Sequence, residues 1–432
     1  MPTKTPVTLL TEKHFAILND DDNKPWANKI KKEEQGKRFF ISWDIRLTND
    51  REALDRAIDW LVDTIPINLQ KRSIEPFRRL AAILLLNLAK GMLQRRWMQI
   101  PRSKGAYDKG STPHQLGFSY RHVTAILDLL VEHEVIYEIK GAKYLEDPQL
   151  SAYQATERFD AAIAIETLSS VELPKLREEL VRINKLDPSR ELTQAELKQL
   201  DQDITDLTRI NSYLNQHSYP LKGSMSRVYS HSVGLSGRIY CEFQSLARRR
   251  VPIRQHSLID GELAVEVDIV ASHPRIAVQE FHDEKLPTTF YQDAADELSI
   301  DRPKIKKLFQ VALSSGNRSK ARKNFIHRTG YDLADYDSIE KWSLNRYPNL
   351  PFYKYWSQLA MNHEGEIIKE VMLRGVDSDI PVLPIHDAVA VRQSDKQWAI
   401  RTLKEVWRDH FGKDYCEVDV KAEDLDKYLP SI

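Results

Sequence analysis

The stretch PVLPIHDAVAV, residues 381–391, places a histidine and an aspartate in the middle of an apolar, β-rich run. The flanking pieces PVLPI and AVAVR predict two short strands, so His386 and Asp387 are expected at the tip of a hairpin. An aspartate at a hairpin tip is most often only a turn former. A functional role for Asp387 therefore requires partners elsewhere in the sequence.

A second strand with a carboxylate near its end occurs earlier in the chain, in GELAVEVDIVASHPRIAV (261–278). The alternation of valine with other residues predicts a half-buried strand, with Asp268 on the face opposite Val265 and Val267. A helix is expected to follow, with Ser272 as a candidate N-cap. If both strands join one antiparallel sheet, Asp268 and Asp387 could hold two Mg²⁺ ions about 3.5–4 Å apart, as phosphoryl transfer requires.

The bulk composition limits the class of protein. A chain of 432 residues predicts roughly two to four domains. Lys+Arg and Asp+Glu both number 63, so any surface for nucleic acid must be local. Cys241 and Cys416 are too few for a disulfide framework or a structural zinc site, which favours a reduced, cytoplasmic compartment. No stretch resembles a signal peptide or a membrane span, so a soluble protein without a membrane partner is expected.

The N-terminal third shows the element order of a winged helix. A helix is predicted over residues 50–64, an apolar helix over 77–93, a basic loop over 94–117, and a helix over 119–136 that Ser119 could cap, followed by two short strands. In a winged helix the capped helix enters the DNA major groove, here led by Tyr120, Arg121 and His122. A helical domain whose charges are merely solvated explains the same pattern.

The middle of the chain combines a helical region with a basic one. Residues 156–215 predict a helical hairpin whose buried stripe contains Leu197, Leu200, Ile204, Leu207 and Ile210. Residues 221–255 contain a single acid, Glu242, and many cations: Lys222, Arg227, Arg238, Arg248, Arg249, Arg250 and Arg254. Tyr229, Tyr240 and Phe243 interleave with these cations, a composition suited to phosphates and stacked bases.

In chain order, these segments resemble the palm and fingers of family A DNA polymerases and of single-subunit phage-type RNA polymerases. The resemblance covers roughly residues 226–412. SGRIY (236–240) is similar to the Gly-Arg motif, which puts its primer-template arginine at Arg238. DIVASHPRI (268–276) is similar to motif A, with its metal-binding aspartate at Asp268 and its last residues at Arg275 and Ile276. IHDAV (385–389) is similar to motif C, with its His-Asp pair at His386 and Asp387.

Motif B is expected in the cationic segment 301–325, in one of two registers. In the first, Arg302 and Lys306 match the start of the motif, and Ser315-Gly316 falls near its end without the family's aromatic residue. The second register runs from Arg318 through Arg322 to Tyr331, with Gly330 ahead of the tyrosine. We prefer the first, because its helix follows motif A at a plausible distance.

Sugar selection is where the sequence departs from the family. His273 occupies the motif A position that is glutamate in the DNA polymerases and small in the RNA polymerases. Serine replaces the motif B aromatic that helps to sense the ribose 2′-hydroxyl. The family's rules for choosing between ribonucleotides and deoxyribonucleotides therefore do not apply here.

The predicted elements and the resemblance together indicate an α+β chain in four parts. These are an N-terminal arm and helix (1–70), a winged helix (71–155), a helical thumb-like region (156–225), and a palm with an antiparallel sheet and reduced fingers (226–432). The resemblance implies a nucleic-acid polymerase that adds nucleotides to a primer or to a de novo start on a DNA template. A primase-like role in the replication of a phage or mobile element is the expected setting, inside a bacterial host cell.

The resemblance also implies the site residues. Asp268 and Asp387 would bind two Mg²⁺ or Mn²⁺ ions, and His386 would orient the motif C turn. The residues expected to bind the nucleoside triphosphate are Arg302, Lys306, Lys307, His273, Ser315 and Gly316. The residues expected to contact DNA are Arg238, Arg248, Arg249, Arg250, Arg254, Arg275, Tyr120 and Arg121.

Two other functions fit parts of the sequence. The first is a DNA-binding replication initiator or regulator with a non-catalytic palm, which the presence of both aspartates disfavours. The second is a metal-dependent nuclease, which ranks last because such sites usually contain more acids than Asp268 and Asp387.

Overall fold

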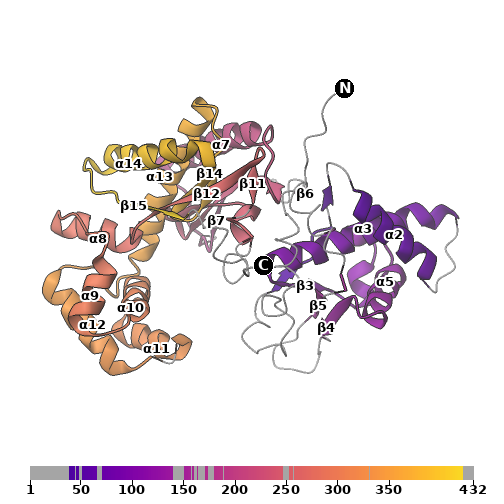
Figure 1. Cartoon of the computed structure of the whole chain (residues 1–432), viewed down its shortest axis with the longest axis horizontal. Coiled ribbons are helices and arrows are strands. Elements are labelled where there is room, and N and C mark those ends of the chain that lie inside the picture. Colours follow the sequence, from indigo (N-terminus) through magenta and orange to yellow (C-terminus); the bar gives the residue numbers. More distant parts are fainter. Residues whose placement is uncertain are drawn as a thin grey trace, which may run out of the picture.

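The computed structural model describes residues 38–43, 45–47, 51–65, 71–139, 150–156, 158–159, 163, 171–173, 180–187, 189–246, 253–255, 257–329 and 331–421. It shows a mixed α+β chain, as predicted (Figure 1). Within these ranges, no helix combines the length and the apolar character needed to cross a bilayer.

The N-terminal part is built on a sheet with the strand order β1-β3-β5-β4. Its strands are β1 (Arg38–Phe40), β3 (Trp97–Ile100), β4 (Ile136–Ile139) and β5 (Ser151–Ala155). Its helices are α2 (Glu52–Thr64), α3 (Lys71–Gln94), the short α4 (Thr112–Gln115) and α5 (Tyr120–Glu132). The predicted order of helix, helix and two short strands is present as α3, α5, β4 and β5, but residues 94–117, predicted as a loop, contain β3 and α4. β3 and β4 both pair antiparallel with β5.

The start of α5 differs in detail from the prediction. Ser119 is its N-cap, and the side chain of Ser119 accepts a hydrogen bond from the backbone N–H of His122 at 3.2 Å. Tyr120, however, is half-buried against Tyr107, with 5.9 Å between ring centroids, and His122 packs on Phe77. Of the three residues expected to lead into a DNA groove, Arg121 alone is exposed.

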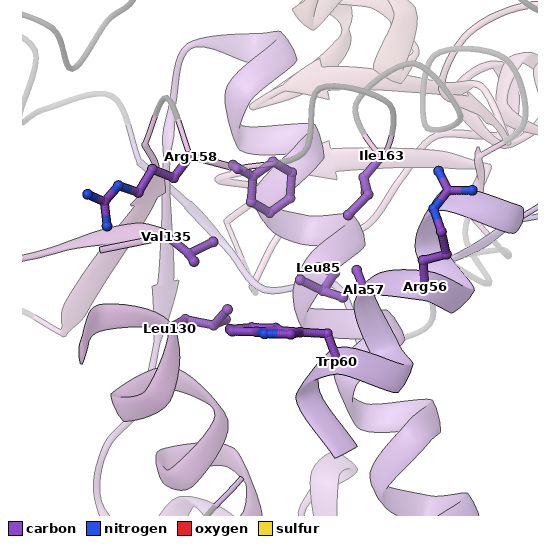
Figure 2. A pocket seen from close by; sticks show the side chains of 9 residues that line it. Arg56, Ala57, Trp60, Leu85, Leu130, Val135, Arg158 and Ile163 are labelled. Carbon is purple, nitrogen blue, oxygen red and sulfur yellow. The ribbon is translucent and has the colours of Figure 1, made fainter. Parts of the chain in front are cut away.

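A pocket of about 280 Å³ lies among α2, α3, α5 and the residues after β5 (Figure 2). Apolar side chains, among them Trp60, Leu85 and Leu130, form most of its lining, and Arg56 and Arg158 lie on opposite sides of it. Arg56 is paired with Glu52 within α2 and Arg158 with Glu134. All the lining residues belong to the N-terminal part of the chain, so this pocket is separate from the residues predicted to do chemistry.

The helical hairpin predicted for residues 156–215 is wrong. Most of its first helix lies outside the described residues, and Val181–Asn184 is a strand, β7, that pairs in parallel with β9 (Ser226–Ser230). The physical reason is a period of two, because Val181 and Ile183 alternate with Arg182 and Asn184. A second short strand, β6 (Val171–Leu173), precedes it, and one long helix, α7 (Gln194–Leu214), follows it.

The buried face of α7 is also not the predicted one. Leu207 and Ile210 are buried as expected, but Leu197 and Ile204 are exposed and Asp203 is fully buried in their place. The carboxylate of Asp203 accepts hydrogen bonds from Arg227 at 2.7 Å, Lys369 at 2.6 Å and Tyr229 at 2.5 Å. This buried ionic cluster, and not a leucine stripe alone, fixes α7 against the rest of the molecule.

The C-terminal part contains the predicted antiparallel sheet, in the order β11-β12-β14-β13, with β15 on the other side of β12. Its strands are β11 (Leu258–Ile259), β12 (Glu262–Ile269), β13 (Leu383–Ile385), β14 (Ala388–Arg392) and β15 (Val418–Lys421). The hairpin predicted around His386 and Asp387 is confirmed as β13-β14, and β12 pairs with β14 so that Asp268 lies opposite Ala388. Two helices flank this sheet: α8 (Ser272–His282) and α14 (Lys396–Phe411). Ala271, with φ of +51°, precedes α8, so Ser272 is its first residue and not its cap.

A lobe of helices is inserted between α8 and the hairpin (Figure 1). It consists of α9 (Phe290–Leu298), α10 (Arg302–Ser314), α11 (Arg318–Thr329) and α12 (Leu333–Arg346). The long helix α13 (Ser357–Asp377) packs on α10 near its start, and then crosses β10 (Ser232–Tyr240) and contacts β13. It thus links the helical lobe to the sheet.

Two glycines allow α13 to cross β10 at close range. A Cβ atom at Gly365 would lie 2.1 Å from the carbonyl oxygen of Gly237, a distance at which something must shift. Gly237 has φ of +81°, and a Cβ atom there would lie 2.6 Å from the ring of Tyr229. This contact of backbone with backbone brings the next residues on each element, Arg238 and Glu364, together.

We expect Gly365→Ala to lower the free energy of unfolding by about 3 kcal/mol, because the added methyl group overpacks a backbone contact. The predicted direction of the stability change is informative, since replacing glycine by alanine in a helix interior otherwise stabilises the helix by about 1 kcal/mol. Urea denaturation would measure the change. Gly234→Ala, also on β10 but with nothing within 4 Å of the new Cβ, is the matched control and should shift stability by less than about 0.5 kcal/mol. Equal effects from both substitutions would contradict a tight crossing.

Candidate active site

The two predicted aspartates lie at the same end of two neighbouring strands. Asp268 is opposite Ala388, and the backbone N–H of Ile269 donates to the carbonyl oxygen of Asp387 at 3.1 Å. Asp268 is 20% exposed and Asp387 is half-buried, so both carboxylates are partly covered and can still be reached. The sheet therefore brings together two carboxylates that are far apart in the sequence.

Arg238 and His273 lie beside them, joined by a carboxylate that the sequence did not single out. Arg238 Nε donates to Glu364 Oε2 at 2.9 Å, and a second ion pair joins its Nη2 to the same oxygen. His273 Nε2 is 3.3 Å from Glu364 Oε1 and 3.3 Å from Arg238 Nη2. Glu364 has no exposed side-chain surface. One buried carboxylate thus fixes both an arginine and a histidine at the site.

The charges of this group act on one another. Burial opposes the ionisation of Glu364, but His273 and Arg238 outweigh it and hold its pKa well below its ordinary value. Burial raises the pKa of Asp387, the negative charge of Glu364 raises it further, and Arg238 partly opposes both. Perturbed carboxylates with specific charge partners are characteristic of functional sites.

His386 has an unusual backbone conformation. Its φ is +57°, in the left-handed region, as the tight turn between β13 and β14 requires. Partial desolvation and then the charge of Arg238 lower the pKa of its imidazole. Its ring lies 6.3 Å from that of Tyr240 in an edge-on arrangement. The role of His386 in orienting the turn that carries Asp387 stays a prediction.

The carboxylates suit a hard divalent cation. Oδ1 of Asp268 is buried and has no hydrogen-bond partner among the described residues, while Oδ2 is ion-paired with Lys421 of β15. In the part of the chain that the structure describes, no three His, Cys, Asp or Glu side chains form a metal-binding group. Mg²⁺ commonly uses only one or two carboxylates and completes its shell with waters and substrate phosphates. Asp268 and Asp387 fit that pattern.

Two of the predicted nucleic-acid contacts lie in the interior of the molecule. Arg254 is buried and pairs with Glu266 at 2.6 Å. Arg275 has no exposed surface and donates to the carbonyl oxygens of Val270, Leu286 and Tyr415. The prediction that Arg254 and Arg275 contact DNA is therefore wrong, because both face inward.

The basic patch as a whole is smaller than predicted. Arg227 is fully buried, with partners in Asp203 and Glu366, and the rings of Tyr229 and Phe243 are buried too. Arg248, Arg249 and Arg250 lie outside the described residues. Most of the described cations of this segment thus balance internal acids that are distant in the sequence.

The structure of the helical lobe distinguishes between the two registers considered for motif B. Arg302 and Lys306 are exposed on α10, and the guanidinium of Arg302 lies 5.8 Å from the ring centroid of Tyr291. Lys307, predicted alongside them, is half-buried and has interaction partners, and Ser315 is buried at the end of α10. Gly316 is covered by the ring of Tyr355.

The competing register is instead engaged in ion pairs. Arg318 of α11 binds Glu340 and Asp337, and Arg322 binds Asp337. These cations are neutralised within the lobe, whereas Arg302 and Lys306 face solvent. The geometry therefore favours α10 as the helix that meets a ligand.

Glu364 and Lys421 are the residues that the sequence reasoning missed. A signal for Glu364 exists, because it shares the buried face of α13 with Ile367, Ile368 and Val371. A carboxylate on an apolar helix face usually has a buried cationic partner. For Lys421 only the pairing of β15 with β12 shows its position.

No protein-family model matches the chain, and a search of curated proteins finds no match.

We predict opposite effects of neutralising the two carboxylates. The folded-state pKa of Asp387 is raised, so its ionised form costs stability above the unfolded pKa of about 3.9, and the cost vanishes below it. Asp387→Asn should thus stabilise the protein at pH 7, and the gain should shrink in acid. Glu364→Gln should lose about 3 kcal/mol at pH 7, since it leaves Arg238 buried without its counter-ion. Urea denaturation at pH 7 and pH 4 would test both. Destabilisation by Asp387→Asn at pH 7 would contradict this account.

Proposed function

We propose that this protein is a template-directed nucleotidyltransferase that extends a nucleic-acid strand with nucleoside triphosphates. One observation supports this most strongly. Three segments far apart in the sequence bring Arg238, Asp268, His273 and Asp387 to one end of the β12-β14 sheet, with Arg238 reaching it from β10. Those are the positions at which the resemblance expects the primer-template arginine, the sugar-side residue and the two metal ligands.

In this proposal Asp268 and Asp387 hold two Mg²⁺ or Mn²⁺ ions. The metals supply activation of the attacking 3′-hydroxyl and neutralisation of charge on the leaving pyrophosphate. The protein's part is positioning, because phosphoryl transfer needs in-line geometry more than covalent catalysis. Pairing with β14 fixes Asp268, and the left-handed turn at His386 fixes Asp387.

Arg238 would hold the nucleic-acid strand against this site. Its bonds to Glu364 use Nε and Nη2, which leaves the Nη1 donors for a phosphate. Because two of its nitrogens are already bonded to Glu364, the guanidinium loses little freedom on binding. Glu364 is then a positioning residue, since it acts through Arg238 and His273.

The exposed cations of α10 would receive the triphosphate. Arg302 lies at the start of the helix and Lys306 one turn later, so the two side chains share a face. Arg302 packs over the buried Tyr291, whose pKa is raised by burial and by the charge of Asp387. That electrostatic coupling supports a position for the start of α10 near the metal site.

A second function is supported by the N-terminal part. The order α3, β3, α4, α5, β4, β5 is that of a winged helix, and Arg121 is exposed at the start of α5. The alternative is a DNA-binding initiator or regulator whose palm is not catalytic. In the polymerase proposal the same domain recruits template DNA, and a primase-like role in replicating a phage or mobile element follows.

Primer extension tests the proposal. Purified protein is incubated with primed and with unprimed single-stranded DNA, with ribo- and deoxynucleotides offered separately in Mg²⁺ or Mn²⁺. We expect extension by the wild type and a loss of more than about a hundredfold in Asp268→Asn, since metal stabilisation of the transition state is worth several kcal/mol. Asp296→Asn, an exposed aspartate of α9, is the matched control and should retain activity.

The outcomes separate the candidates. Absence of extension with every nucleotide pool, together with retained binding to duplex DNA, would favour the initiator. Full activity in Asp268→Asn would reject the site assignment.

A further inference from the structure

The segment FYKYW, residues 352–356, has an unusual backbone. Tyr353 has φ of +64° and Tyr355 has φ of +54°, in a left-handed region that bulky residues rarely adopt. Strain of this kind persists where the surrounding structure enforces it, and it gathers at ligand sites. Two such residues within three positions therefore call for a functional explanation.

Bonds to the end of α10 hold the segment in place. The backbone N–H of Tyr353 donates to the carbonyl oxygen of Ala312 at 2.7 Å, and that of Tyr355 to Ser315 at 3.2 Å. These acceptors belong to the last turn of α10 and to its cap, where carbonyl groups lack partners within the helix. The phenol of Tyr353 bonds to the hydroxyl of Tyr336 at 2.7 Å. Phe352 and Trp356, at either end, are buried.

Tyr355 is the exception, because 49% of it is exposed. Its ring lies directly against Gly316, where a Cβ atom would come within 2.1 Å of the ring. The ammonium of Lys320 is 5.8 Å from the ring centroid. The result is an aromatic ring that is rigidly supported, open to solvent and accompanied by an exposed cation.

We infer that Tyr355 is a stacking platform for an unpaired base of the nucleic acid, with Lys320 at the neighbouring phosphate. Every base has a π-face, so an exposed ring beside a cation binds single strands with little regard to sequence. The inference rests on the proposed function and adds to it a place for the single-stranded template.

Tyr355 lies two residues before α13, the helix that carries Glu364. The platform therefore stands at the start of the element that reaches the candidate site.

The test is a binding measurement that needs no catalysis. Primer-template DNA with 2-aminopurine at successive positions of the single-stranded template is titrated with the Asp268→Asn protein, and fluorescence and affinity are recorded. We expect quenching at one position of the single-stranded template. Tyr355→Leu should abolish the quenching and weaken affinity about tenfold, while Tyr355→Phe should preserve both. Phe40→Leu, at an exposed aromatic of β1, is the control and should change neither.

The outcomes distinguish this inference from the proposed function. If the protein binds the DNA but Tyr355→Leu behaves like Phe40→Leu, the platform is wrong and the polymerase proposal is unaffected. If the Asp268→Asn protein does not bind primer-template at all, both fail. Equal circular dichroism and melting temperature for the Tyr355 variants show that a loss of binding is not a loss of fold.

Discussion

The candidate site depends on one contact of backbone with backbone, where α13 crosses β10 at Gly365 and Gly237. A side chain at Gly365 would meet the backbone of β10, and one at Gly237 would meet the ring of Tyr229. With both absent, Arg238 and Glu364 form their ion pair beside Asp387, and His273 joins them from the start of α8. The crossing therefore links the helical lobe, the sheet and the predicted nucleic-acid arginine in one rigid arrangement. Two elements whose backbones touch can pack only in a few discrete positions. Such packing suits a site that must hold its side chains in a fixed geometry.

Buried ion pairs bring the basic segment after residue 221 together with acids from other parts of a chain that is neutral overall. Arg227 meets Asp203 and Glu366, Arg254 meets Glu266, and Arg238 meets Glu364. Each arginine comes from the basic segment after residue 221, and most of its partners come from elsewhere in the chain. Buried pairs of this type are weak evidence for stability, because desolvation offsets much of their attraction. Their consequence here is orientation, since α7, β9, β10 and α13 can pack only where the charges meet.

The sequence predicted the parts of the structure that depend on local pattern. The strand ending at Asp268, the hairpin at His386 and Asp387, and the cap at Ser119 follow from periodicity and turn chemistry, and the structure contains them. Predictions that rested on composition alone were less accurate, because composition does not show which charged side chains lie close together in the fold. The basic composition of residues 221–255 predicts a nucleic-acid surface, although Arg227 and Arg254 are buried.

Other features could not be found without tertiary contacts. The parallel pairing of β7 with β9 is a long-range contact, and the buried face of α7 follows from Asp203 meeting Arg227. Glu364 shows how far local pattern reaches. Its position on an apolar helix face marks it as unusual in the sequence, but only the fold shows which arginine it binds. The central claim is that Asp268 and Asp387 form one metal site for nucleotidyl transfer. Its most direct test is electron paramagnetic resonance of Mn²⁺ titrated into the protein with a nucleoside triphosphate and primer-template. The account predicts that the wild type binds two Mn²⁺ ions. It predicts that Asp387→Asn retains its fold but loses both Mn²⁺ sites, or the signal that the two ions share. Equal Mn²⁺ binding by the wild type, Asp268→Asn and Asp387→Asn would contradict it.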